Sequence, residues 1–129
     1  MIQHNKIDDQ AFYYDPRLWK VKEYVDRHYP EPLSLEAVAK IAGLESADFS
    51  ELFHDKTGIR FDDWLSSVRV IYAIELMAHG DRPLTEQSLK KIALEVGFGD
   101  LSTFERAVEK FTGRTPRSEK SSLRLSISS

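Results

Sequence analysis

Apolar residues recur three and four positions apart along most of this chain, and no stretch alternates apolar and polar residues convincingly. This spacing is typical of amphipathic helices that bury one face. The first pattern follows Asp15 and Pro16, which suit the N-cap and the first position of a helix. It stops before the Pro-Glu-Pro sequence at 30–32. The pattern predicts an all-α protein of about seven helices.

Four shorter helical patterns and one long one follow. The short ones start at Ser34, at Ser46, at Ser88 and just after Gly97. The long one starts at Phe61 and runs to residue 80, so a helix of about 18 residues would be about 27 Å long. Residues 1–14 show no clear period and are predicted to form a tail or linker, with the Phe-Tyr-Tyr sequence at 12–14 as the part that can pack against the helices. The Ser-rich segment 118–129 is predicted to form a flexible tail.

The two pairs of short helices are copies of one another. Ser34, Leu35, Val38, Ala39 and Gly43 match residues 54 positions later, and the Phe and Gly that follow match at an offset of 55. Each copy has a small Ala in its first helix, which lets a second helix cross closely, and a Gly at the turn, which tolerates positive φ. The repeat therefore predicts two helix-turn-helix subdomains, 15–60 and 81–117, joined by a bridging helix at 61–80.

Composition and charge restrict the possible functions. The chain of 129 residues has no cysteine, which excludes disulfides and thiolate metal sites and favours a cytoplasmic protein. No apolar run is long enough to span a membrane. The net charge of −3 is a weak argument against a nucleic-acid partner, because such a partner is itself negatively charged. Only residues 88–117 lean basic, with six basic and four acidic groups.

Catalytic chemistry has no support in the sequence. The four histidines form no closely spaced pair, so we expect no metal site. There is no nucleophile motif and no phosphate-binding loop, and the Gly-Phe-Gly sequence at 97–99 is typical of a turn. We therefore expect neither an enzyme nor a cofactor.

Over about residues 16–117 the chain resembles the DNA-binding domain of the AraC/XylS family of bacterial transcription regulators. The resemblance rests on "PLSLEAVAKIAGL", "FSELF" and "TG" in the first copy, "RVIYAIELM" in the bridge, and "SLKKIALEVGFGDLSTFERAVEKFTGRTP" in the second copy. It implies a sequence-specific binder of double-stranded DNA whose two second helices read successive major-groove segments. We expect this chain by itself to be a monomer.

By that resemblance, the outer faces of the second helices carry the DNA contacts. In the first copy these are Ala47, Ser50 and Glu51, with His54 nearer the backbone. In the second copy they are Ser102, Thr103, Glu105 and Arg106, with Lys110 and Arg114 near phosphates. Ser34 and Ser88, which are expected to start their helices, would offer N-terminal amides to phosphates.

Several positions depart from the family pattern. Glu51 stands where Arg is usual, and His54, Asp55 and Glu109 stand where Lys is common. These changes weaken the attraction to phosphate mostly in the first copy. They motivate an alternative function, in which the same fold is a protein-interaction module that docks on RNA polymerase or a partner regulator.

Overall fold

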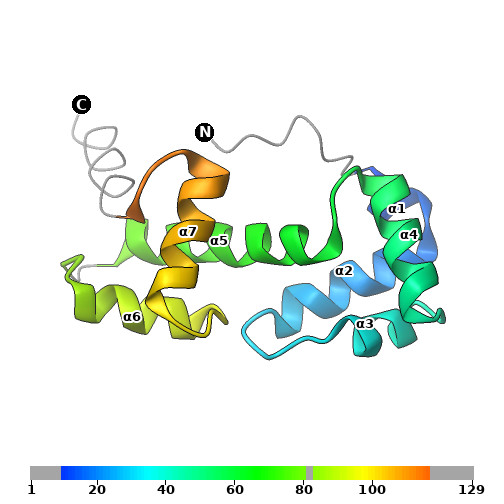
Figure 1. The fold of residues 1–129 in the computed structure, drawn as a ribbon, viewed down its shortest axis with the longest axis horizontal. Helices are drawn as coiled ribbons and strands as arrows, with labels where there is room; N and C mark the ends of the chain where they lie inside the picture. The colour runs from blue at the N-terminus through cyan, green and yellow to red at the C-terminus, as the bar shows by residue number, and fades with distance from the viewer. Residues whose placement is uncertain (1–9, 81–82, 117–129) are drawn as a thin grey trace. The chain divides into compact units, whose positions relative to one another are not determined.

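All regular secondary structure in the described part of the chain is helical, as predicted. The computed structural model describes residues 10–80 and 83–116. In these ranges the helices are α1 (Ala11–Tyr14), α2 (Pro16–His28), α3 (Leu35–Ile41), α4 (Ser46–Thr57), α5 (Phe61–His79), α6 (Glu86–Glu95) and α7 (Leu101–Thr112) (Figure 1). They form two compact units, which meet in the chain between Leu65 and Ser66. The boundary therefore falls inside α5, the predicted bridging helix.

The first unit starts earlier than the sequence predicts. Residues 11–14 form α1, and the ring of Phe12 is only 1% exposed. Its centroid lies 5.9 Å from that of Phe53 and 5.1 Å from that of Trp64. Residues 11–14 are therefore a helical turn and not a tail, and of the Phe-Tyr-Tyr sequence only Phe12 is buried. Burial of this one large aromatic ring stabilises a turn that has no periodicity of its own. Residues 1–9 of the predicted tail lie outside the described residues.

Local capping and a shared aromatic core explain the rest of this unit. Asp15 caps α2 by accepting a hydrogen bond from the Arg17 amide at 2.9 Å, and Pro16 occupies the first helical position. Helix α2 packs against α1 and α3, and α3 packs against α4 (Figure 1). The core rings come from α1, α4 and the start of α5: Phe12, Phe49, Phe53, Phe61 and Trp64. The outer faces of α2 and α4 are left free of core contacts.

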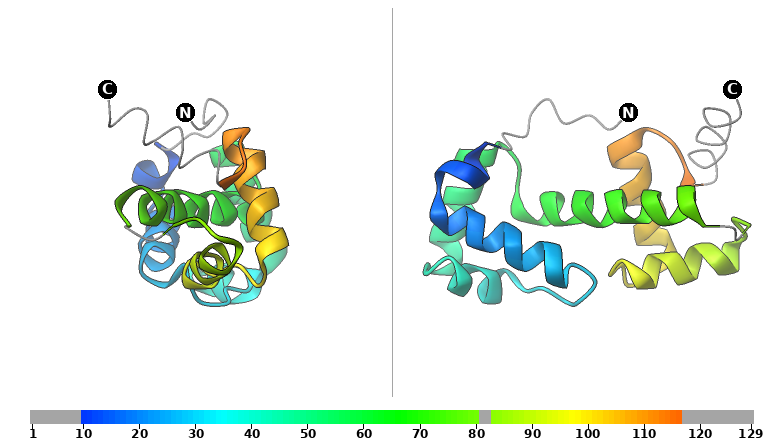
Figure 2. Two further views of the ribbon diagram at one scale, coloured as in Figure 1. Left: turned by 90° about the vertical axis from the view of Figure 1, so that its left-hand side faces the viewer. Right: turned by 180° about the vertical axis from the view of Figure 1, so that it is seen from behind.

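In the second unit, helices α6 and α7 pack against each other (Figure 2). The rings of Phe98 and Phe104 lie 5.5 Å apart. The other fully buried members come from α5, α6 and α7, among them Val70, Ala73, Met77, Leu89, Ile92 and Val108. The predicted tail at 118–129 lies outside the described residues.

Helix α6 begins before Ser88, so the prediction that Ser88 starts this helix is wrong. Thr85 is the N-cap, and its hydroxyl accepts from the Ser88 amide at 3.1 Å while the Ser88 hydroxyl accepts from the Thr85 amide at 3.0 Å. This reciprocal capping box satisfies two helix-end amides at once, which favours the earlier start. A Thr three residues before a Ser was the available sequence signal.

The two helix-turn-helix turns have the same hydrogen-bonded geometry. The Leu44 amide donates to the Ala39 carbonyl at 2.9 Å, and the Phe98 amide donates to the Ala93 carbonyl at 2.8 Å. The glycine of each turn has positive φ, +74° in the first and +104° in the second, as the repeat predicts. Both turns are therefore Schellman-type helix ends, which glycine adopts without steric cost.

The second helices also end alike. The Thr57 hydroxyl donates to the Phe53 carbonyl at 2.6 Å, and the Thr112 hydroxyl donates to the Val108 carbonyl at 2.7 Å. A left-handed glycine follows each threonine, with φ of +80° and +76°. The sequence repeat is thus a structural repeat from the first helix of each pair to the end of the second.

Candidate nucleic-acid interface

Helix α4 presents all four predicted contact residues to solvent. Ala47, Ser50, Glu51 and His54 are exposed and lie at the three- and four-residue spacing of one helical face. The opposite face, with Phe49 and Phe53, is completely buried. The packing of α4 within its own unit therefore leaves a continuous outer stripe available for a partner.

Helix α7 has the same division. Its buried face carries Phe104, Ala107 and Val108. The predicted contact residues are all exposed: Ser102, Thr103, Glu105, Arg106 and Lys110 on the helix, and Arg114 just after it. This helix is also strongly amphipathic, which separates a polar outer face from an apolar inner one.

The two outer faces differ in charge. On α4 the exposed carboxylates Asp48, Glu51 and Asp55 outnumber the single exposed lysine, Lys56. On α7 two exposed acids are balanced by Arg106 and Lys110, and exposed Arg114 follows. DNA phosphates attract cations and repel carboxylates, so α7 is the better suited of the two helices to a nucleic acid.

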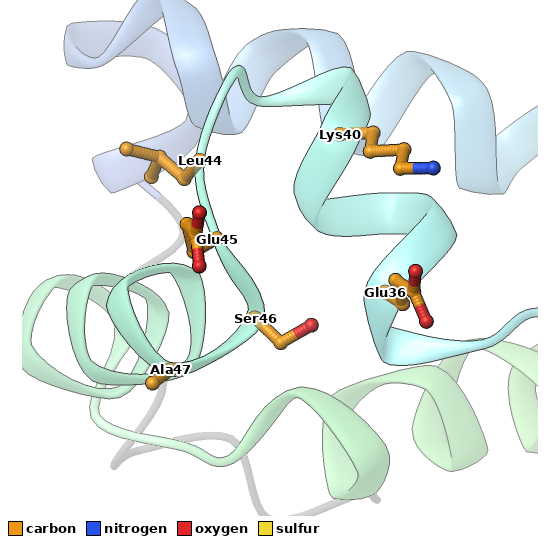
Figure 3. A pocket seen from close by; sticks show the side chains of 6 residues that line it. All are labelled: Glu36, Lys40, Leu44, Glu45, Ser46 and Ala47. Atoms are coloured by element: carbon orange, nitrogen blue, oxygen red, sulfur yellow. The ribbon is translucent and has the colours of Figure 1, made fainter.

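The N-terminus of α4 opens into a hollow beside α3. Figure 3 shows Glu36 on the α3 side, and Glu45 and Ser46 at the start of α4, with the Ser46 side chain pointing toward α3. Glu45 is the N-cap residue, but its side chain makes no capping hydrogen bond. Helix N-termini attract anions through free amides, and the two carboxylates oppose that attraction here.

The N-terminus of α7 is capped by Asp100. One carboxylate oxygen accepts from the Thr103 amide at 2.7 Å. Hydrogen bonds from the backbone and side chain of Thr103, together with the positive charge of Arg106, lower the pKa of Asp100 below its ordinary value. The carboxylate is therefore ionised and its position is defined by the helix start.

The two serines expected to lie near phosphates have different roles. Ser34 is the N-cap of α3, and its hydroxyl accepts from the Ala37 amide at 3.1 Å. Ser88 lies inside α6, and its amide is bonded to Thr85. Only the first of the two therefore stands at a helix start, where free amides face outward.

The described residues offer little for other classes of site. Within 10–80 and 83–116, no group of His, Asp and Glu is arranged to hold a metal ion. None of the helices in those ranges is both long and apolar enough to cross a membrane.

Comparison with known sequences identifies relatives over most of the chain. Residues 38–121 match the model of a helix-turn-helix domain family. The chain is 28% identical over 109 residues to an uncharacterized HTH-type transcriptional regulator of Staphylococcus aureus, covering 84% of this chain and 14% of the relative. It is 33% identical over 104 residues to the regulatory protein PocR of Salmonella typhimurium, covering 81% of this chain and 33% of PocR. The chain thus spans a minor part of the length of these relatives.

Solved structures share the fold. The C-terminal domain of AraT, a response regulator from Geobacillus stearothermophilus, superposes with a TM-score of 0.72 at 25% identity, covering 83% of this chain and 85% of that one. The DNA-binding domain of AdpA, a global transcriptional factor solved in complex with a target DNA, gives a TM-score of 0.74 at 22% identity, covering 86% and 95%. The family match covers more than half of the chain, and the relatives and the paired helix-turn-helix units agree with it. This chain therefore belongs to the AraC/XylS family, as a DNA-binding domain of that type.

Proposed function

We propose that this domain binds double-stranded DNA sequence-specifically and regulates transcription, with α4 and α7 reading successive major-groove segments of one asymmetric site. The observation that carries the proposal is the matched burial of the two second helices. Each buries its apolar face in its own unit and exposes a stripe of polar residues. A helix with a free polar face is the element that helix-turn-helix proteins insert into the major groove.

Helix α7 supplies most of the proposed base reading. Arg106 reaches guanine O6 and N7 with two parallel hydrogen bonds, and Glu105 accepts from cytosine N4. Ser102 and Thr103 carry hydroxyls, which can donate or accept. Lys110 and Arg114 contact phosphates, where their charge raises affinity for every sequence.

Helix α4 contributes less affinity. Ala47 offers a methyl group to thymine, and Ser50 and Glu51 offer polar contacts to base edges. His54 lies nearer the DNA backbone, and the N-terminal amides of α3 beside Ser34 face a phosphate. The carboxylates on this face make its net interaction with the phosphate backbone weaker than that of α7.

Selection from random duplexes at low salt tests the proposal. We expect one sequence class to be enriched, and Arg106→Ala to lose about 1–3 kcal/mol of binding free energy with relaxed preference at one base pair. Lys110→Ala should weaken all sequences evenly and reduce the salt slope by about 1. Enrichment of no sequence would contradict DNA reading, and unchanged preference in Arg106→Ala would contradict the role of that residue.

We also propose that one cytoplasmic copy of the domain occupies one site and that it has no catalytic activity. Two reading helices in one chain make a symmetric partner unnecessary. Sedimentation of the complex should give one protein per duplex, whereas a ratio of two would contradict this.

The family match favours DNA binding over the protein-interaction module that would dock on RNA polymerase.

A further inference from the structure

Because the two units are copies of one another, three side chains at the start of α7 can be compared with the equivalent side chains of α4. Asp100, Thr103 and Arg106 are spaced three residues apart, so they lie close together along one edge of the helix. At the offset of 55, the equivalent positions of α4 all carry carboxylates: Glu45, Asp48 and Glu51. The arrangement of a cap, a hydroxyl and a guanidinium therefore belongs to the second unit alone among the two copies.

These three side chains are linked in the structure. The Asp100 carboxylate accepts from the Thr103 amide at 2.7 Å. An Arg106 guanidinium nitrogen, Nη2, donates to the Thr103 hydroxyl oxygen at 3.5 Å. The same two neighbours lower the pKa of Asp100, because hydrogen bonds from Thr103 and the positive charge of Arg106 both favour the ionised carboxylate. All three residues are exposed, so the link forms on the outer face of α7.

We propose that Thr103, itself held by Asp100, is a positioning residue that keeps the Arg106 guanidinium over the outer face of α7 before DNA arrives. This rests on the proposed function, in which Arg106 reads a base. Thr103 then contributes to DNA binding by holding the Arg106 guanidinium, and its hydroxyl does not contact a base directly.

The physical advantage is a smaller entropic cost of binding. Ordering one long, flexible side chain at an interface costs about 0.5–1.5 kcal/mol, which corresponds to about twofold to tenfold in affinity. A guanidinium already tethered to Thr103 and attracted by Asp100 has lost part of that freedom in the unbound protein. Removal of the tether should therefore lower affinity within this range, and only when Arg106 is present to benefit.

A measurement on the free protein tests the tether without DNA. Thr103→Val removes the hydroxyl and keeps the shape of the side chain, while Thr103→Ser keeps the hydroxyl. Nitrogen relaxation of the Arg106 Nε–H group should show a less ordered side chain in Thr103→Val and near wild-type order in Thr103→Ser, with helix content the same in all three. Equal order in Thr103→Val and the wild type would overturn the proposal.

A double-mutant cycle on the selected duplex tests the consequence. At low salt, Thr103→Val should weaken binding by about twofold to tenfold and relax the base preference assigned to Arg106, but have little effect in an Arg106→Ala background. Thr103→Ser should restore both affinity and preference. An equal loss in both backgrounds would mean that the hydroxyl contacts DNA directly and would overturn the positioning role. If the wild type selects no duplex, the proposed function fails, and the relaxation experiment still decides the tether.

Discussion

Replacement of Glu51 by arginine gives a direct test of why the two reading helices differ. Glu51 is exposed on α4, and the equivalent residue on α7 is Arg106. The substitution therefore places in the first unit the residue type that the second unit already has. It also leaves the buried face of α4 unchanged, because Phe49 and Phe53 point away from position 51 into the core.

The expected size of the effect follows from the charges on α4. Asp48, Glu51 and Asp55 face solvent with Lys56 as the one exposed lysine of this helix, and Glu51→Arg changes the charge of the helix by two units. If the new guanidinium contacts one phosphate, the slope of log affinity against log salt becomes steeper by about 0.9. Between 50 and 200 mM salt, the affinity of the variant should then fall about 3.5-fold more than that of the wild type.

Fluorescence anisotropy with the selected duplex across that salt range measures both slopes. Glu23→Arg is the matched control, because Glu23 is exposed on α2 and its replacement changes the net charge equally. We expect the control to leave the slope close to that of the wild type. If Glu51→Arg and Glu23→Arg behave alike, the effect comes from net charge, and α4 does not lie against the DNA backbone.

Two further predictions concern stability. Thr57→Val should lower the free energy of unfolding of the first unit by about 1–3 kcal/mol, because its buried hydroxyl is bonded to the backbone of Phe53 and Ile59. The Thr112 hydroxyl makes the equivalent bonds at a half-buried site, so Thr112→Val should cost only about 0.5–1.5 kcal/mol. Urea unfolding followed by tryptophan fluorescence for the first unit and circular dichroism for both checks this, and equal costs would refute the burial argument. The Arg17 side chain donates a hydrogen bond to Asp15 and lowers the pKa of that carboxyl. The ionised Asp15 carboxylate therefore stabilises the folded state above its unfolded pKa of about 3.9, and this stabilisation is lost as the pH falls through the lower folded pKa. Asp15→Asn, which keeps a capping oxygen, should therefore show a shallower loss of unfolding free energy on acidification to about pH 2, and an unchanged pH profile would contradict the assignment.

The exposure of the candidate contact residues could be predicted from the sequence because helical periodicity is local. Periodicity alone separates the buried Phe49 and Phe53 from the exposed Ser50 and Glu51, and the same reasoning holds along α7. The role of Thr103 could not be predicted in this way. Helical spacing brings a hydroxyl within reach of Arg106, but only the side-chain conformations show that the two are bonded.

The sequence by itself determined the all-α class, the two matched helix-turn-helix units and the exposed faces of their second helices. The reason is that a helical period, a Schellman turn and a Thr-Gly helix end each depend on residues no more than about six apart. Only the tertiary structure decided that Phe12 belongs to the first core, because its partners Phe53 and Trp64 are distant in the chain. The N-cap of α6 is different in kind: Thr85 and Ser88 are only three residues apart, so their capping box is a local feature, and the folded chain shows that Thr85 is the cap.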